Sequence, residues 1–257
     1  MSPSSQLHRV IRSSVFIILS VLLGQGIHGF SSETQIEGAF RAASSAGSLI
    51  ACQTSNASII VSYTADDGGT NLVKISDKIC MAVEGIAADA LFVADKAVEE
   101  HAEHMFVFNS EVPLRRLAGS IAQMVHRRTL SPFMRPFGIR ALFVGVDGNR
   151  LPQVLEVDPL GSVHHCKIVF VGPLGLASVW GKETDPMDMS SSQCVRKCIS
   201  VLKEALSNSN DEFHISRVKI AIVDAHTARM LEDGSIRKAM EEDDFTFIDR
   251  DHEAAVL

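Results

Sequence analysis

The sequence predicts an α+β fold in which packed β-sheets carry helices on their outer faces. Short runs rich in valine, isoleucine and tyrosine gather between residues 49 and 83. Two segments with helical spacing then follow one another between residues 87 and 132, and strand-like runs resume at residue 138. Grouped strands and grouped helices are typical of packed sheets with helices on the outside.

The first strands are predicted as two hairpins. Residues 49–52 and 58–63 are apolar runs separated by a polar stretch, and residues 72–75 and 79–83 form a second pair. The sequence Asp66-Asp67-Gly68-Gly69 between the pairs is a turn signal.

Helical spacing begins at residue 87. Asp89 lies in the first turn of the first predicted helix, residues 87–106, where a carboxylate interacts favourably with the helix dipole. The apolar stripe of this helix consists of Leu91, Ala94, Val98, Ala102 and Met105. A second helix is predicted from Pro113 to before Pro132, with an apolar stripe of Leu114, Leu117, Ile121, Met124 and Val125.

The second half of the chain returns mainly to strands. Strands are predicted at residues 138–146, 151–157, 163–171 and 218–223, with the last taken as the final strand. Helices are predicted at residues 190–206 and 233–242. The tail from residue 243 is expected to be loose.

Composition limits the class of protein. The 257 residues are 46% hydrophobic and 21% charged, which suits a globular domain with a substantial core. The net charge is −7, and the basic pairs Arg115-Arg116 and Arg127-Arg128 lie on a predicted helix. A nucleic-acid-binding protein usually presents a basic face, so this function is not expected.

The first 29 residues have the pattern of a secretory signal. A basic stretch without acids precedes an apolar run at residues 15–23, and small residues follow at Gly24, Gly26 and Gly29. The run is short for a membrane span; anchoring is the weaker alternative, and a third is that the mature protein lacks the segment. The chain is therefore divided into a signal-like segment (1–29), a domain (30–242) and an acidic tail (243–257).

The five cysteines are interpreted as small buried apolar groups. They are Cys52, Cys80, Cys166, Cys194 and Cys198, an odd number that does not indicate a disulfide framework. Cys194 and Cys198 are one helical turn apart, and no second pair completes a zinc site. No metal or cofactor is expected. This use of cysteine favours a reducing compartment and conflicts with the signal-like segment.

Several motifs, in the right order, resemble the proteasome alpha-subunit family over residues 30–242. Phe30, Gln35, Glu37, Ala39 and Phe40 match positions of the family's N-terminal signature, Phe-Ser-Pro-Glu-Gly-Arg-Leu-Tyr-Gln-Val-Glu-Tyr-Ala. Residues 74–83, followed by Gly85 and Asp89, resemble the family's strand and its entry into the first helix. Further matches are Arg135, Pro136 and Gly138 in Arg-Pro-Phe-Gly, Asp158 and Gly161 in an Asp-Pro-x-Gly turn, and the strand at residues 218–224.

The resemblance implies a four-layer αββα sandwich of two antiparallel sheets, like that of N-terminal-nucleophile hydrolases. It also implies a place in a heptameric ring of alpha subunits stacked on a beta ring, with regulatory particles as further partners. In that family the ring controls the entry of substrates for ubiquitin-dependent protein degradation. The resemblance therefore implies a location in the cytoplasm and the nucleus. A helix at residues 34–45 is expected to pack on the neighbouring subunit.

The resemblance implies a subunit without peptidase activity. Catalytic beta subunits use an N-terminal threonine with a nearby aspartate and lysine. The matching positions here are Gly47-Ser48, Tyr63 and Asn71. Other chemistry is not expected at His101 and His104, at His164-His165-Cys166, or at Gly172–Gly175, because none of them has the spacing of a metal or phosphate site.

The sequence departs from the family where the ring is gated. Gly38 replaces a tyrosine of the signature, and Thr34 and Gln35 replace a glycine-arginine pair. A lysine that receives the carboxylate of an activator is missing, since the matching positions are Thr64, Ala65 and Asp66. Two alternatives stay open: an exported or plastid-directed binding protein with the same fold, and a divergent amidohydrolase with Ser48 as nucleophile.

Overall fold

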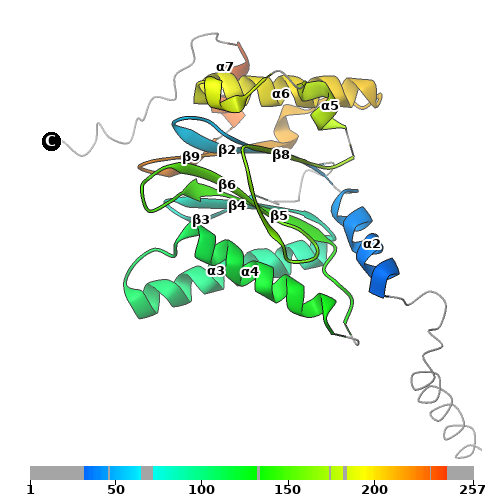
Figure 1. The fold of residues 1–257 in the computed structure, drawn as a ribbon. Helices are drawn as coiled ribbons and strands as arrows, with labels where there is room; N and C mark the ends of the chain where they lie inside the picture. The colour runs from blue at the N-terminus through cyan, green and yellow to red at the C-terminus, as the bar shows by residue number, and fades with distance from the viewer. Residues whose placement is uncertain are drawn as a thin grey trace, which may run out of the picture.

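Two five-stranded antiparallel sheets lie face to face between two layers of helices in the computed structural model (Figure 1). The structure describes residues 32–45, 47–64, 72–131, 134–173, 175–181, 184–231 and 233–241. The four-layer αββα sandwich implied by the resemblance is therefore confirmed.

The strands divide between the sheets as follows. The first sheet has the order β10-β9-β2-β1-β8, with β1 Ser48–Gln53, β2 Ala57–Tyr63, β8 Ile168–Val171, β9 Val218–Asp224 and β10 Ala228–Leu231. The second has the order β3-β4-β5-β6-β7, with β3 Leu72–Ser76, β4 Ile79–Gly85, β5 Ile139–Val146, β6 Pro152–Val157 and β7 Val163–Cys166.

The helices cover the outer faces of both sheets. The first sheet is covered by α5 Leu176–Trp180, α6 Ser191–Asn208 and α7 Asp233–Glu241, and the second by α3 Ala87–Phe108 and α4 Leu114–Thr129 (Figure 1). Helix α2 Ser32–Ala43 lies at one end of the sandwich, and η1 Pro186–Asp188 and η2 Ile215–Arg217 are short 3-10 turns. No helix within the described ranges has the length and apolar character that crossing a bilayer requires.

Both predicted hairpins form. Strands β1 and β2 pair in register from Ser48 with Tyr63 to Gln53 with Ser58. The Thr54 hydroxyl closes the turn, donating to the Ala57 carbonyl at 2.9 Å and accepting from the Ala57 amide at 3.0 Å. Strand β2 is buried along its whole length because it pairs on both edges and is covered on both faces.

Three apolar layers hold the four structural layers together. The middle layer lies between the sheets and includes Leu49, Ile60 and Leu142, all with no exposed surface. The outer layers pack α6 on the first sheet and α3 and α4 on the second. The predicted stripe of the second helix is confirmed, since Leu114, Leu117, Ile121 and Val125 are buried there, with Met124 partly buried beside them.

The apolar stripe predicted for the first helix does not face the sheet. Leu91 is 61% exposed, and Val98 and Met105 are exposed as well. The buried face instead carries Asp89, Ala90, Val93, Ala97 and His104. Small residues let a helix backbone approach a sheet closely, whereas helical spacing gives a stripe without saying which side of the helix it meets.

One predicted strand is two strands in different sheets. Residues 163–171 divide at Lys167: β7 pairs with β6 in the second sheet and β8 pairs with β1 in the first. The carbonyl of Lys167 accepts from the Gln53 amide at 2.8 Å, which fixes the crossing. The prediction of one strand was wrong because residues that favour strands carry no signal for a corner between sheets. The prediction that residues 218–223 are the final strand was also wrong, since β10 pairs with β9.

Gly85, at the end of β4, meets Gly138, just before β5. Gly85 has a φ of +128°, and a Cβ at this position would overlap the Gly138 carbonyl oxygen. That carbonyl accepts from the Ile86 amide at 2.9 Å immediately before α3 begins. Only glycine combines this backbone conformation with so close an approach.

We predict that Gly85→Ala lowers the free energy of unfolding by at least about 3 kcal/mol, because it introduces both backbone strain and a steric overlap. The matched control is Gly119→Ala in α4, where an added Cβ meets no atom within 4 Å. Gly119→Ala should raise the free energy of unfolding by about 0.5–1 kcal/mol. Urea unfolding of the two variants measures both effects, and equal stabilities would contradict the constraint at Gly85.

Candidate functional site

The position of the expected nucleophile is part of a strand. Ser48 begins β1, is 2% exposed, and is joined through a peptide bond to Gly47. The Gly47 amide donates to Oε2 of Glu84 at 2.8 Å. A nucleophile that uses its own α-amine as base needs that amine free, so Ser48 lacks the required arrangement. The second position, Tyr63, is buried and donates its hydroxyl to the Glu212 carbonyl at 3.2 Å; Asn71 lies outside the described residues.

Charged side chains lie at the same end of the sandwich. Glu84 has no exposed surface and is the register partner of Arg140 on the neighbouring strand. Arg140 donates from Nε to Oε1 of Glu156 at 2.6 Å, and Glu156 is 6% exposed. Ionic side chains from three neighbouring strands therefore lie at this end of the second sheet, near Ser48.

Asp89 connects the start of α3 to the segment before β5. Its carboxylate receives both terminal nitrogens of Arg135, at 2.6 and 2.8 Å, and the Gly138 amide at 3.1 Å. Arg135 also donates to the Pro136 carbonyl at 3.0 Å. Family-motif residues 46 positions apart in sequence therefore form one site beside Gly85.

The environment of Asp89 sets its protonation. Burial alone raises its pKa, but the hydrogen bond from Arg135, the Gly138 amide, and the charges of Arg135 and Arg128 outweigh burial and hold the pKa below its ordinary value. The Asp89 side chain is 8% exposed and that of Arg135 is 52% exposed, so part of the charge interaction is screened by water.

The Asp-Pro-x-Gly turn connects β6 to β7 and packs against α4. Oδ1 of Asp158 accepts the amides of Leu160 at 2.9 Å and Ser162 at 2.8 Å. Gly161 has a φ of +79°, and a Cβ there would overlap the Ala122 carbonyl of α4. The roles of Asp158 and Gly161 are accordingly in the packing of the turn.

Helix α2 brings the N-terminal motif to the same end of the second sheet. Ala39 and Ala43 are buried, and Ala42 lies against Gly138. Gln35 and Phe40 are half-buried, and Glu37 is exposed beside Arg41 at 3.7 Å. The predicted helix is confirmed with slightly different bounds, while Phe30 lies outside the described residues.

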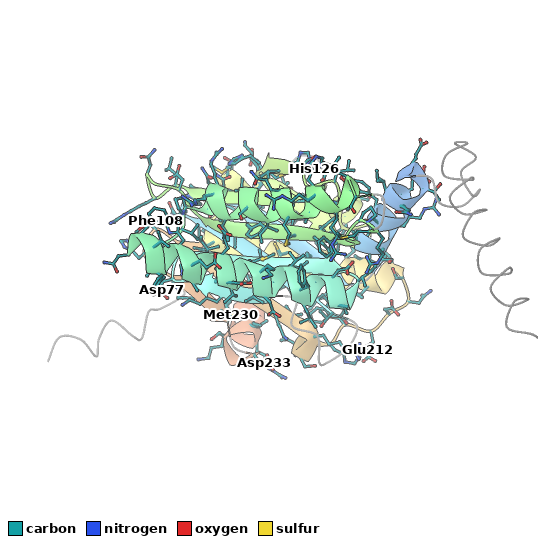
Figure 2. The ribbon with its side chains drawn as sticks, turned by 90° about the horizontal axis from the view of Figure 1, so that it is seen from below. Asp77, Phe108, His126, Glu212, Met230 and Asp233 are labelled. Atoms are coloured by element: carbon teal, nitrogen blue, oxygen red, sulfur yellow. The ribbon has the colours of Figure 1, made fainter. Side chains whose placement is uncertain are left out.

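Helix α3 carries an exposed surface on which several apolar side chains lie among the charged residues Asp95, Glu99 and Glu103. We call it the α3 apolar face; Figure 2 looks onto this helical layer, with Phe108 at one end. Phe106 is 91% exposed, and exposed apolar patches on soluble proteins commonly mark interaction surfaces. The exposed members are Leu91, Phe92, Val98, Met105, Phe106, Val107 and Phe108.

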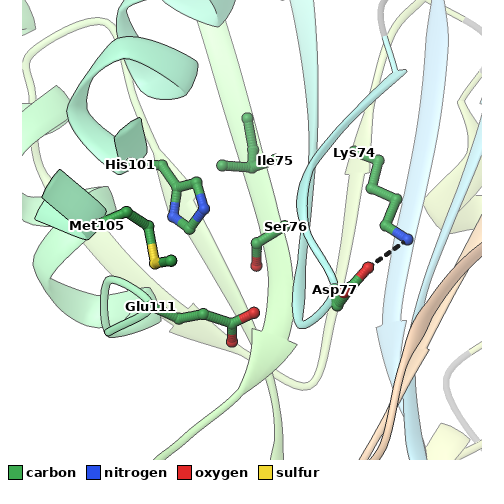
Figure 3. A pocket seen from close by; sticks show the side chains of 7 residues that line it. All are labelled: Lys74, Ile75, Ser76, Asp77, His101, Met105 and Glu111. Atoms are coloured by element: carbon green, nitrogen blue, oxygen red, sulfur yellow. Dashed lines mark ion pairs between the residues drawn. The ribbon is translucent and has the colours of Figure 1, made fainter. Parts of the chain in front are cut away.

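A pocket of about 420 Å³ lies between the β3–β4 turn and the end of α3 (Figure 3). His101, Ser76 and Glu111 line it, and Lys74 pairs with Asp77 at its edge at 2.8 Å. Nδ1 of His101 is buried and has no hydrogen-bond partner within the described part of the chain. The lining thus combines an imidazole with a carboxylate, and Glu111 also pairs with Lys78 at 3.5 Å.

The histidine motifs do not converge on an ion. His104 is buried and its Nδ1 lies 2.9 Å from the Ser110 carbonyl, whereas His101 lines the pocket. His164 lies 3.3 Å from Asp158. Over the described ranges, the cluster whose ligand atoms come close enough to share an ion is formed by Cys52, Cys194 and Cys198.

Comparison with known proteins assigns the family. The model of the family "Proteasome subunit" matches residues 43–223, and the chain belongs to this family. Three relatives are alpha-type subunits. "Proteasome subunit alpha type-3" of Drosophila melanogaster is 35% identical over 136 residues, which are 50% of this chain and 53% of the relative. "Proteasome subunit alpha type-7" of Dictyostelium discoideum is 26% identical over 148 residues, 58% and 59% of the two chains.

A third relative is matched over a longer stretch. "Proteasome subunit alpha type-2" of Dictyostelium discoideum is 25% identical over 189 residues, which are 70% of this chain and 81% of the relative. The chain spans little more than half the length of the first two relatives. The proteasome alpha-subunit resemblance noted from the motifs is confirmed.

We predict that Asp89→Asn lowers the free energy of unfolding at pH 7 by roughly 1–3 kcal/mol, because two charge-assisted bonds are weakened. The folded pKa of Asp89 lies below 3.8, the ordinary value that this side chain has in the unfolded chain. Above pH 3.8 the wild type therefore keeps the stabilising contribution of ionised Asp89. It loses this contribution as the pH falls through the folded pKa.

In urea unfolding series the variant should show a flatter loss of stability as the pH falls below about 4. Asp77→Asn is the control, because Asp77 is 74% exposed in its pair with Lys74. This substitution should change the free energy of unfolding by less than about 0.5 kcal/mol. An Asp89→Asn variant with the stability and acid dependence of the control would show that the pair does not hold this end of the fold.

Proposed function

We propose that this chain is a non-catalytic, structural subunit of the alpha ring of a proteasome core particle. In that role it contacts sister alpha subunits and the beta ring and supports ubiquitin-dependent protein degradation by ring assembly and substrate gating. The observation that carries the proposal is the α3 apolar face on a body with the family's two complete sheets. A surface of this kind is favourable when a partner covers it.

The geometry around Ser48 supports the non-catalytic assignment. Ser48 is buried within β1, and the preceding amide is bound to Glu84. The amidohydrolase alternative requires cleavage before Ser48, which would remove α2 and the contact of Ala42 with Gly138. The proposed contribution of this subunit to the particle is therefore the contacts that its surfaces make with other subunits.

The docking of activators is proposed to be weak in this subunit. Thr64, the first of the three residues that stand where the family has its lysine, is only 8% exposed. Ala65 and Asp66 lie outside the described residues. An aspartate in this region repels the carboxylate of an activator, whereas lysine attracts it. We infer that ring formation is retained and docking is left to neighbouring subunits.

Cytoplasm and nucleus are the proposed locations, in line with a proteasome role. The signal-like pattern of residues 1–29 supports a second candidate, an exported or plastid-directed paralogue that uses the fold for binding. A reporter fused behind residues 1–35 separates the two. Entry into the secretory route or a plastid supports the second candidate, and a diffuse cytoplasmic and nuclear signal supports the first.

We predict that the tagged wild-type chain is recovered in one large particle with other alpha and beta subunits. The double variant Leu91→Glu/Val98→Glu should fold, because both side chains are exposed, and its recovery in the particle should fall at least about tenfold. The reason is that covering an unpaired carboxylate at an interface is strongly unfavourable.

Lys96→Glu is the matched control, since it also adds negative charge to α3 but at a position that is polar in the wild type. Native purification with mass spectrometry of bait and partners measures the recovery. If the double variant assembles as well as Lys96→Glu, the α3 apolar face is not the assembly surface. A lone wild-type chain without proteasome partners would overturn the proposed function itself.

A further inference from the structure

Three cysteine side chains from distant parts of the chain meet inside the outer core layer of the first sheet. Cys52 belongs to β1, and Cys194 and Cys198 lie one turn apart on α6. All three have no exposed surface. Sγ of Cys52 lies 2.8 Å from Sγ of Cys194 and 3.8 Å from Sγ of Cys198. The interpretation of the cysteines as small buried groups is confirmed for Cys52, Cys80, Cys194 and Cys198, whereas Cys166 is only half-buried.

The surroundings of the cluster are apolar. Ile50, Trp180, Val195 and Ile199 belong to the same buried layer. A charged group in such a layer is strongly unfavourable unless it is compensated, whereas a disulfide is neutral and occupies about the same space as two thiols. If the thiols of the cluster react, the apolar surroundings therefore favour a neutral product such as a disulfide over a charged one.

The sulfur atoms differ in their readiness to react. Cys194 lies in the first turn of α6, where the helix dipole favours a thiolate. Hydrogen bonds from Cys198 and Cys52 lower the pKa of Cys194 to about 5 against the effect of burial. The hydrogen bond to Cys194 and burial raise the pKa of Cys52 well above its ordinary value. Of the two sulfurs in contact, that of Cys194 therefore loses its proton more readily than that of Cys52.

We propose that Cys52 and Cys194 are a site of reversible covalent cross-linking, at which a small hydroperoxide joins β1 to α6 through a disulfide. Cys198 is the reserve partner, because its sulfur is also within 4 Å of Cys52. The proposal is independent of assembly into a ring, since all three residues lie within one chain.

The chemistry balances with hydrogen peroxide as the oxidant. The Cys194 thiolate attacks one peroxide oxygen, so an S–O bond forms, the O–O bond breaks, and the other oxygen leaves as hydroxide. The Cys52 sulfur then attacks the Cys194 sulfur, so the S–S bond forms and the S–O bond breaks. The thiol proton of Cys52 and one proton from solvent complete two molecules of water. Two thiol sulfurs are oxidised by two electrons in total, and the peroxide is reduced.

A metal ion fits the same cluster less well. Structural zinc sites have four ligands, and the described residues bring three ligand atoms together here. Three sulfurs about 2.3 Å from one ion stand about 4 Å from each other, whereas Cys52 and Cys194 are 2.8 Å apart. Three thiolates around a monovalent or divalent ion also leave a net charge in the apolar layer.

The cross-link would connect residues 142 positions apart. A loop of that length gains much from closure, because the bond removes many conformations from the unfolded chain. The expected effect is a rise in the melting temperature of roughly 10 °C on oxidation, reversed by dithiothreitol.

The test uses the full-length reduced protein, exposed to hydrogen peroxide and then alkylated under denaturing conditions. Trypsin cuts after Arg196 and Lys197, which places Cys194 and Cys198 in different peptides. Non-reducing mass spectrometry should find the Cys52 peptide joined to the Cys194 peptide. Cys166→Ser is the matched control and should keep the link, whereas Cys194→Ser should shift it to Cys198 at a lower rate.

The wild-type peptide map decides the proposal without any variant that has to fold. Full alkylation of Cys52 and Cys194 after oxidant treatment, or oxidation confined to Cys166, would overturn it. A stoichiometric metal in the purified protein, lost only when all three cluster thiols become reactive, would also overturn it in favour of a metal site. A linked peptide without the rise in melting temperature contradicts the stabilising role.

Discussion

The close approach of Gly85 and Gly138 fixes the point beside the second sheet at which β4 ends and α3 begins. Because Gly85 has no side chain, the Gly138 carbonyl can accept the Ile86 amide and fix the point at which β4 becomes α3. Asp89 then binds the Gly138 amide and Arg135 from the first turn of that helix. Helix α2 packs against the same place through Ala42. Strand β4 and the helices α2 and α3 therefore meet at one backbone contact.

The layer between the two sheets is filled by side chains from both of them. Apolar side chains occupy most of this layer, and Glu84, Arg140 and Glu156 lie at the end where Ser48 begins β1. Ser48 is buried there, and the Gly47 amide donates to Glu84. Many of the exposed apolar side chains of the described residues lie on the α3 apolar face.

Family and fold assignments rest on different kinds of information. Membership of the proteasome subunit family follows from the match over residues 43–223, and the relatives are alpha-type subunits. The architecture independently has two five-stranded sheets between helices. A role in a ring depends on surfaces of several chains, so the recovery of partner subunits is the measurement that tests it.

Elements with local signals can be predicted from the sequence alone. The two hairpins, the stripe of α4 and the turn at Asp158 follow from spacing and turn residues, and the linear motifs indicated Gly85, Asp89, Arg135 and Gly138 one by one. Which of these groups meet is visible only in the folded chain. Tertiary packing turned the larger apolar residues of α3 outward, divided residues 163–171 between two sheets, and brought Cys52 to Cys194. The physical reason is that periodicity reports an element's own geometry, while its partners are selected by packing between segments far apart in the chain.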